Sequence, residues 1–409
     1  MIELKSKKEC CGCSACVNIC PQKCIIMKED EEGFIYPAVN AKTCIECNLC
    51  RQVCPILNSH ASRQMNPHTS VISAARENHE QNASGFCPST YAAYCLDQEI
   101  RQMSSSGGIF FTVAEQVLKT GGIVFGVRLA EDCRSAYHIS VENKNELSLL
   151  LGSKYMQSNP GNCFSEARRY LEEGRRVLFV GAPCQIEGLK KFLKKDYPYL
   201  LCMDFICHGV PSPKTWRKYL KYRERQANDS ACAVQFRNKN FGWQKYQLSI
   251  QFENGGCYRK EHAEDLYMKL FLNNISMRPS CYSCSFRKIN RVSDLTIADF
   301  WGIGRTVPEM DDDKGTSLIV VHSAKGKDLL EAIRDQIRLK EVDAKRAFSE
   351  NPSVKKQPVK PLLRGRYFTT IDRLPIETAG ARYLILSEWK KKLRKIKKSI
   401  ILSKKKKGT

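Results

Sequence analysis

The sequence CCGCSACVNICP at residues 10–21 is matched by CIECNLCRQVCP at residues 44–55. Both stretches follow the pattern Cys-x2-Cys-x2-Cys-x3-Cys-Pro, and the two-residue spacing lets a turning backbone aim three sulfurs at one point. In the bacterial two-cluster pattern the fourth sulfur comes from the other repeat. A single Cys-x-x-Cys would suit zinc equally well, but two complete runs closed by proline favour iron and sulfide. We therefore predict two 4Fe–4S clusters.

The repeat pattern also assigns the ligands of the two clusters. The first cluster is predicted to be held by Cys10, Cys13, Cys16 and Cys54. The second is predicted to be held by Cys44, Cys47, Cys50 and Cys20. Cys11 and Cys24 fall outside the pattern and are predicted to be spectators. Residues 1–58 thus resemble the bacterial-type two-cluster ferredoxins, which relay single electrons.

This ferredoxin-like module is a small part of a 409-residue chain, which is long enough for two or three domains. Residues 59–85 are polar and aperiodic and are interpreted as a linker. Residues 86–340 are expected to hold the group that gives or takes the electrons, with an N-terminal part at 86–170 and a C-terminal part at 171–340. Residues 341–409 are expected to form an irregular segment that ends in a basic tail.

Cysteine usage and hydropathy predict a cytoplasmic protein. The chain has 21 cysteines, but we find no apolar leader and no uncharged apolar run of about 18 residues, so reduced intracellular thiols are expected. The formal net charge is +23, which raises the alternative of nucleic-acid binding. No basic-aromatic or zinc-finger spacing accompanies that charge, and much of it lies in the tail. We therefore predict no nucleic-acid partner.

The lysine-rich tail permits a different kind of contact. A helix over residues 388–407 would place Trp389, Leu393, Ile396 and Ile400 on one face, opposite lysines. A basic amphipathic helix of this kind suits peripheral contact with an anionic membrane surface. A solvated tail is the alternative, and the residues alone leave both open.

Strands alternate with helices beyond the linker. Apolar runs at 122–129, 137–142, 176–183 and 200–207 are interpreted as strands, and the last two run into helices, which predicts an α/β layer with some parallel pairing. Further on, short strands around a predicted hairpin at 254–256 indicate an α+β part. The expected fold class is therefore α+β and α/β, with a ferredoxin-like two-cluster module joined to a mixed α/β domain.

Four further cysteines occur in motif-like surroundings. Cys184 and Cys207 follow predicted strands at their carboxyl ends, where ligand loops are expected, and Cys281 and Cys284 form a Cys-x2-Cys pair. Together they could make a cage of four thiolates and hold a third 4Fe–4S cluster. Zinc, or unrelated buried thiols, are the alternatives.

A loop of serine and glycine opens a predicted helix near residue 109. The loop contains Ser105, Ser106, Gly107 and Gly108. Free backbone N–H groups at such a helix start attract a phosphate group or the electron-rich edge of a flavin. An ordinary capped helix is the alternative.

Taken in order, these motifs resemble the beta subunits of coenzyme F420 hydrogenases and dehydrogenases. The stretches that carry the resemblance are SSGG at 105–108, GSKY at 152–155, GAPCQ at 181–185, ICHG at 206–209, CYSC at 281–284 and SDLTIADFWG at 293–302. The resemblance implies a mixed α/β flavin and iron–sulfur domain containing FAD. It places the flavin near the serine–glycine loop, with Lys154 and Gln157 as further candidate contacts.

The resemblance also implies a function. The chain is expected to be an iron–sulfur flavoprotein oxidoreductase, passing electrons between 4Fe–4S clusters and a flavin that exchanges hydride with a deazaflavin or another acceptor. Its partner would be a redox protein or a small-molecule hydride carrier. A non-catalytic electron-relay subunit is one alternative, and a reductase serving surface-polysaccharide biosynthesis is another. No catalytic side chain is singled out by the sequence.

Overall fold

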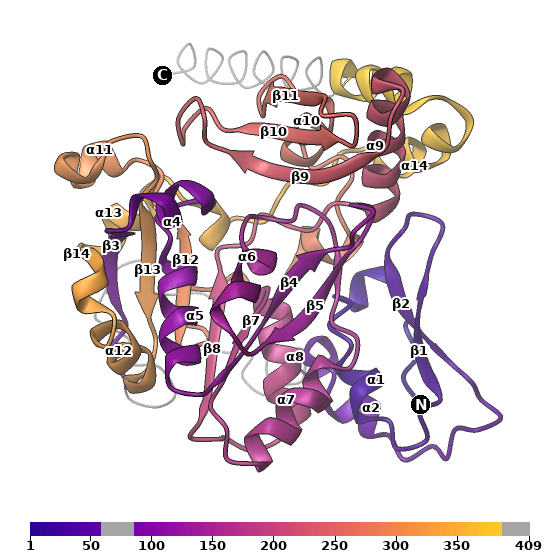
Figure 1. The fold of residues 1–409 in the computed structure, drawn as a ribbon. Helices are drawn as coiled ribbons and strands as arrows, with labels where there is room; N and C mark the ends of the chain where they lie inside the picture. The colour runs from indigo at the N-terminus through magenta and orange to yellow at the C-terminus, as the bar shows by residue number, and fades with distance from the viewer. Residues whose placement is uncertain (59–85, 387–409) are drawn as a thin grey trace, which may run out of the picture.

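The computed structural model describes residues 1–58 and 86–386, whose strands form three sheets (Figure 1). The predicted linker at 59–85 and the predicted basic helix at 388–407 lie outside the described residues. Every helix within the described residues is too short or too polar to span a bilayer.

The N-terminal module consists of one antiparallel hairpin and short helices beside it (Figure 1). The turn of the hairpin is held by Asp30, whose Oδ1 accepts N–H bonds from Glu32 and Phe34. Each α-helix starts two residues after the second cysteine of its repeat, so the two repeats fold alike. The elements are η1 (Lys7–Glu9), α1 (Ala15–Ile19), β1 (Ile25–Glu29), β2 (Ile35–Val39) and α2 (Leu49–Gln52).

The largest sheet has nine strands. In spatial order they are β14 (Ile337–Glu341), β3 (Ser89–Cys95), β13 (Ser317–Val321), β12 (Leu295–Asp299), β8 (Leu200–Phe205), β7 (Val177–Val180), β4 (Ile123–Leu129), β5 (Ala136–Val141) and β6 (Ser158–Asn159). β12, β8, β7 and β4 pair in parallel, as β5 does with β6, and the other pairs are antiparallel. The predicted mixed α/β layer is confirmed, and the four predicted strands are β4, β5, β7 and β8.

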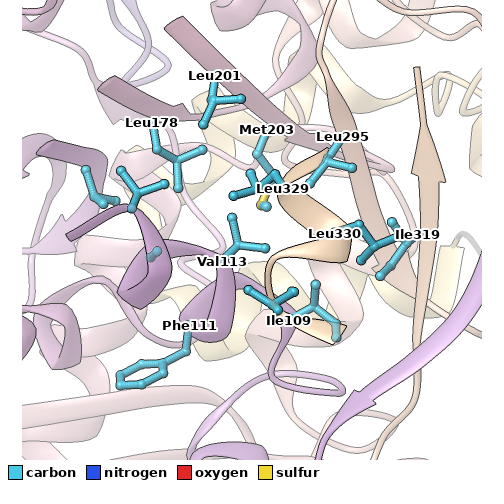
Figure 2. Packing of buried hydrophobic residues seen from close by; sticks show 14 of the residues in the cluster. Ile109, Phe111, Val113, Leu178, Leu201, Met203, Leu295, Ile319, Leu329 and Leu330 are labelled. Atoms are coloured by element: carbon cyan, nitrogen blue, oxygen red, sulfur yellow. The ribbon is translucent and has the colours of Figure 1, made fainter. Parts of the chain in front are cut away.

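The two faces of this sheet bury different helices, because alternate residues of a strand point to opposite sides. On one face Leu178 and Leu201 pack against α5 (Ile109–Lys119) and α12 (Ala324–Glu331), as Figure 2 shows. On the other face Phe179 and Leu200 pack with α7 (Cys163–Glu172) and α8 (Pro183–Leu193). Ala15 of the N-terminal module belongs to this second core. The module is therefore packed onto the α7–α8 side of the sheet.

A separate antiparallel sheet contains β9 (Ala231–Asn238), β10 (Gln247–Phe252) and β11 (Cys257–Glu261). The predicted hairpin at 254–256 joins β10 to β11, and Gly255 there has a φ of 85°, which favours glycine. Trp216 of α9 (Pro213–Ala227) and Tyr267 of α10 (Leu266–Leu272) bury their rings against Phe236 of this sheet. This aromatic core accounts for the α+β part of the prediction.

The prediction of an irregular segment after residue 340 is wrong for the described part. β14 pairs with β3, and helices α13 (Ala344–Ser349) and α14 (Arg364–Arg373) follow. Tyr367 and Ile371 of α14 are fully buried, in a core that includes Phe34 of the N-terminal module. The helix was missed because prolines flank it and because its apolar face packs on a segment distant in the sequence. β3, which lies between β13 and β14, was also not predicted.

The other short helices complete the described chain. The α-helices are α4 (Gln98–Met103), α6 (Leu147–Leu150) and α11 (Ile303–Thr306). The 3-10 helices are η2 (Lys144–Glu146), η3 (Pro279–Ser283), η4 (Pro308–Met310), η5 (Arg334–Gln336) and η6 (Pro352–Val354).

Candidate functional site

The four cysteines predicted to bind the second cluster surround a small cavity. We call Cys20, Cys44, Cys47 and Cys50 the second cage; all four line this cavity. Cys24 lines it too, with its Sγ 3.4 Å from that of Cys20, although it was predicted to be a spectator. Cys47 is exposed and Cys50 is buried, so the cavity lies at the surface of the module. A hollow enclosed by four thiols fits a cluster held by thiolates.

The four cysteines predicted for the first cluster are also neighbours. We call Cys10, Cys13, Cys16 and Cys54 the first cage. Burial raises the pKa of Cys16, and the nearby thiols of Cys10 and Cys54 raise it further. Burial raises the pKa of Cys54 to about 11, again with Cys10 among the causes. The thiol of Cys13 is buried and is influenced by that of Cys16. The fold thus brings this set together in a dry environment.

A third set of thiols gathers where the large sheet meets η3. We call Cys184, Cys207, Cys281 and Cys284 the third cage. Cys184 opens α8 directly after β7, and Cys207 follows β8, so two adjacent parallel strands deliver two of the sulfurs. Burial raises the pKa of Cys281 to about 12, and Cys207 and Cys284 raise it further. Within residues 1–58 and 86–386, no three His, Cys, Asp or Glu side chains converge on the position of one metal ion.

Cys11 connects the first and third cages, and sequence reasoning missed it. Its thiol is hydrogen-bonded to Cys13 of the first cage and to Cys184 of the third, and these bonds hold its pKa well below the usual range. Its position beside Cys10 was the only signal in the sequence. The two cages are therefore separated by a single side chain.

The serine–glycine loop is packed tightly against the sheet. Ser106 Oγ donates to the Thr316 carbonyl at 3.1 Å, and the Gly107 N–H donates to Ser317 Oγ at 3.0 Å. A Cβ added to Gly107 would lie 2.6 Å from the Ala93 carbonyl, so only glycine fits there. Gly108 begins α5 with a φ of 85°. Part of the loop's hydrogen-bonding capacity is thus used within the protein.

A cavity of about 690 Å³ lies beside this loop, within the size range of ligand pockets. Lys154, Arg237 and Lys239 line it, and the neighbouring Ser153 N–H donates to Ser105 Oγ at 2.8 Å. Burial lowers the pKa of Lys154 to about 7, while its Nζ donates to the Leu150 and Leu151 carbonyls. Burial likewise lowers the pKa of Lys239 to about 7. A basic, partly enclosed cavity fits an anionic dinucleotide such as FAD.

Gln157 is not brought together with the other candidate flavin contacts. Its Oε1 accepts from the Ile35 N–H at 3.1 Å and from Arg278 Nη1 at 3.0 Å, so it contacts the N-terminal module. Lys154 lies three residues before it and lines the cavity. Three residues of extended chain span at most about 11 Å. The segment from Lys154 to Gln157 therefore connects the cavity wall with the module.

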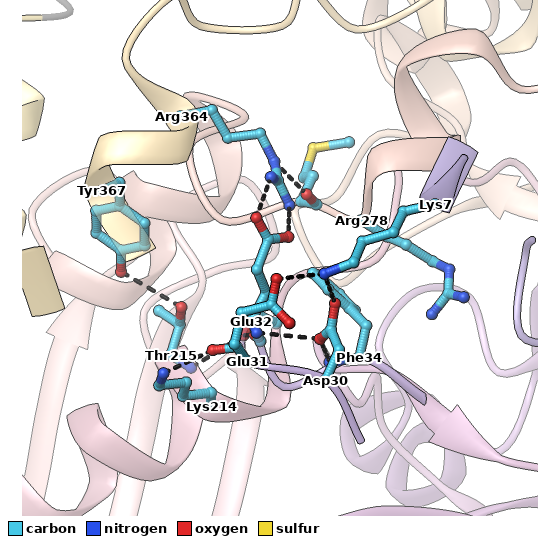
Figure 3. A network of polar contacts seen from close by, with 12 residues as sticks. Lys7, Asp30, Glu31, Glu32, Phe34, Lys214, Thr215, Arg278, Arg364 and Tyr367 are labelled. Carbon is cyan, nitrogen blue, oxygen red and sulfur yellow. Dashed lines mark hydrogen bonds and ion pairs between the residues drawn. The ribbon is translucent and has the colours of Figure 1, made fainter. Parts of the chain in front are cut away.

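Polar contacts hold the module against the rest of the chain (Figure 3). Arg364 of α14 forms a bidentate ion pair with Glu32, at 2.7 and 2.6 Å, and both side chains are largely buried. Lys214 Nζ donates to the Glu31 carbonyl at 2.6 Å. Gly33 approaches the Lys214 backbone so closely that an added Cβ would lie 2.6 Å from its nitrogen. This interface fixes the orientation of the module.

Two families match the chain. Residues 9–57 match the family described as 4Fe-4S dicluster domain. Residues 174–346 match the family described as the C terminus of the beta subunit of coenzyme F420 hydrogenase/dehydrogenase. The first and second cages lie in the former range and the third cage lies in the latter. The serine–glycine loop, Lys154 and Gln157 lie outside both ranges.

Comparison with individual proteins gave two further matches. An uncharacterized ferredoxin from Methanocaldococcus jannaschii is 35% identical over 49 residues, which are 12% of this chain and 62% of that protein. The match therefore spans less than two thirds of that ferredoxin. A chain of the F420-reducing NiFe hydrogenase complex from Methanosarcina barkeri aligns with a TM-score of 0.45 and 17% identity, over 65% of this chain and 89% of that chain.

A dicluster domain accommodates two 4Fe–4S clusters, in agreement with the two cysteine repeats. The second family consists of oxidoreductases. The chain therefore carries an N-terminal 4Fe–4S dicluster domain joined to a C-terminal domain of the coenzyme F420 hydrogenase/dehydrogenase beta subunit family, whose members are iron–sulfur oxidoreductase subunits.

Proposed function

We propose that this chain is an iron–sulfur flavoprotein oxidoreductase with three 4Fe–4S clusters and FAD, which exchanges hydride with a deazaflavin or another acceptor. The observation that carries the proposal is the contact of Cys11 with both Cys13 and Cys184, because it places the third cage directly beside the first. Four thiols in each of three adjoining sets are what a chain of redox stations needs.

The exposure of the cages supports an order of transfer. Cys47 of the second cage is exposed, whereas Cys13, Cys16 and Cys54 of the first cage are buried. Electrons are proposed to enter or leave through a partner protein at the second cage and to pass through the first cage to the third. Burial of the inner cages excludes water, which strengthens electrostatic interactions there.

The flavin is proposed to occupy the cavity lined by Lys154 and Lys239. When bound, a flavin supplies the exchange between hydride and single electrons. Lys154, Arg237 and Lys239 offer positive charge to the pyrophosphate of the dinucleotide. Ser105 holds the Ser153 backbone, and this bond shapes the cavity wall beside Lys154.

A relay subunit without flavin is the second candidate, and two observations favour it. The Gly107 N–H is already bonded to Ser317, and Gln157 is occupied at the module interface. Two of the six residues expected to contact a flavin thus have other partners. The cavity at Lys154 is the observation that favours a flavoprotein over a relay.

Anaerobic reconstitution with iron, sulfide and FAD separates these candidates. The proposal predicts about twelve irons per chain from three clusters, and one tightly held flavin with its absorbance and quenched fluorescence. Turnover would then be measured in parallel with reduced deazaflavin, NADH and reduced ferredoxin. Clusters without flavin would establish the relay instead. Zinc at the cages, or no iron and no acid-labile sulfide, would contradict both candidates.

A further inference from the structure

Arg278 lies between the N-terminal module and the rest of the protein, and its side chain is only 1% exposed. Its Nε donates to the Cys10 carbonyl at 2.9 Å, and its Nη2 donates to the Ile35 carbonyl at 3.0 Å. Its Nη1 donates to Gln157 Oε1 at 3.0 Å. The rigid fork of one guanidinium thus joins two backbone positions of the module to one side chain outside it. A lysine could not satisfy all three acceptors in this geometry.

The positive charge of Arg278 has no carboxylate partner in the described part of the chain. A buried unpaired charge costs several kcal/mol unless something negative compensates it. Burial acts to lower the pKa of Arg278, but Cys10, Tyr36, Cys11 and Cys281 outweigh it and leave the pKa raised. The ring of Tyr36 adds a cation–π contact at 4.2 Å. The negative groups that compensate the guanidinium are therefore thiols of the first and third cages and of Cys11.

The surroundings of Arg278 fit a role at the junction of the two cages. A Cβ on Gly12 would lie 3.2 Å from Arg278 Nη1, so the guanidinium abuts the loop between Cys10 and Cys13. Cys281 of the third cage donates its N–H to the Arg278 carbonyl at 3.0 Å. The second cage differs, because its Cys47 is exposed and solvent screens charges there.

We propose that Arg278 is a positioning residue that locks the module in place, and that its fixed charge raises the reduction potential of the clusters at this junction relative to that of the second cluster. The inference deepens the proposed function and rests on its clusters. Each cluster accepts one electron, supplied by a chemical reductant in the test below, and no bond forms or breaks. With four thiolates the net charge changes from −2 to −3, and a buried cation stabilises the more negative state.

Redox titration of the reconstituted full chain, followed by electron paramagnetic resonance, tests this proposal. Arg278→Met is expected to shift the midpoint potentials of the inner clusters to more negative values and to leave the exposed cluster unchanged. Arg278→Lys, which keeps the charge, is expected to titrate close to wild type. The matched control is the double variant Glu32→Gln/Arg364→Met, which removes a buried pair of zero net charge from the same interface. It is expected to leave all potentials unchanged.

A protease site introduced within residues 59–85 tests the positioning role. After cleavage the wild-type module should remain bound to the rest of the chain, and in Arg278→Lys it should be released faster. Wild-type potentials in Arg278→Met, or an equal shift in the double variant, would overturn the electrostatic role. Retention of the cleaved Arg278→Lys module at the wild-type level would overturn the positioning role, and this variant decides alone if Arg278→Met assembles no clusters. Neither measurement involves flavin or turnover, so the proposed function can fail independently.

Discussion

The thiol of Cys11, in the N-terminal module, is hydrogen-bonded to the thiol of Cys184 at the start of α8. One side chain thus spans the boundary between the dicluster domain and the domain that follows it. The module is packed onto the α7–α8 face of the sheet and held by Arg364 and Lys214, so this contact belongs to a fixed interface.

Replacing Cys11 by alanine should leave all clusters in place, because the repeat pattern supplies four ligands to each cluster without it. Iron and acid-labile sulfide should match the wild-type values, whereas Cys16→Ala should lose about four irons. Transfer of electrons from the module to the third cage should be slower in Cys11→Ala, measured by rapid-mixing spectroscopy. Loss of a cluster in Cys11→Ala would instead identify Cys11 as a ligand.

Cys281→Ser tests the third cage. If Cys281 binds a cluster, this variant should contain about four irons fewer than the wild type and lack one set of paramagnetic signals. Cys257→Ser is the control, because Cys257 is an exposed thiol on β11 outside the three cages. Equal iron contents in the two variants would show that the third cage holds no cluster.

Gly188→Ala should destabilise the protein although alanine favours helices. Gly188 lies inside α8, and an added Cβ would sit 2.9 Å from both Cβ and Sγ of Cys13. Overpacking costs about 1–3 kcal/mol, whereas the gain in helix propensity is about 1 kcal/mol. The net expectation is a lower thermal midpoint and an altered signal from the first cluster.

Gly365→Ala is the matched control for Gly188→Ala. Gly365 also lies in a helix, α14, but no atom lies within 4 Å of an added Cβ. Its replacement should therefore raise stability by about 0.5 kcal/mol through the loss of backbone freedom. A lower thermal midpoint in Gly365→Ala, or none in Gly188→Ala, would contradict this packing argument.

Binding of FAD should weaken as the pH rises through about 7. The pKa values of Lys154 and Lys239 are each lowered to about 7 by burial, so both amines are charged below that pH and neutral above it. A charged amine favours the anionic pyrophosphate, and loss of one proton changes the affinity by at most about tenfold per pH unit. Quenching of flavin fluorescence at pH 6, 7 and 8 measures the change.

Lys154→Met should flatten this pH dependence and leave the part due to Lys239. Lys340→Met, at an exposed lysine on β14 that pairs with Glu309 outside the cavity, should keep the wild-type profile. An affinity that does not change with pH in the wild type would exclude these lysines from the flavin site.

The local patterns of the sequence were informative wherever neighbours in the chain are also neighbours in space. The apolar runs predicted β4, β7 and β8, and the carboxyl ends of β7 and β8 do bring Cys184 and Cys207 together. The cluster ligands themselves remain predictions, although the fold gathers each set. The prediction for Gln157 has less support, because this side chain faces the module instead of the cavity.

The sequence by itself determined the two cysteine repeats and the alternation of strands and helices, because cluster ligation and sheet burial impose short, regular spacings on the chain. Only the tertiary structure decided that Cys11 meets Cys184, that Arg278 closes the interface and that α14 packs on Phe34. These contacts join residues far apart in the chain. They depend on how helix faces and loops pack across the sheet, and no local periodicity encodes that packing.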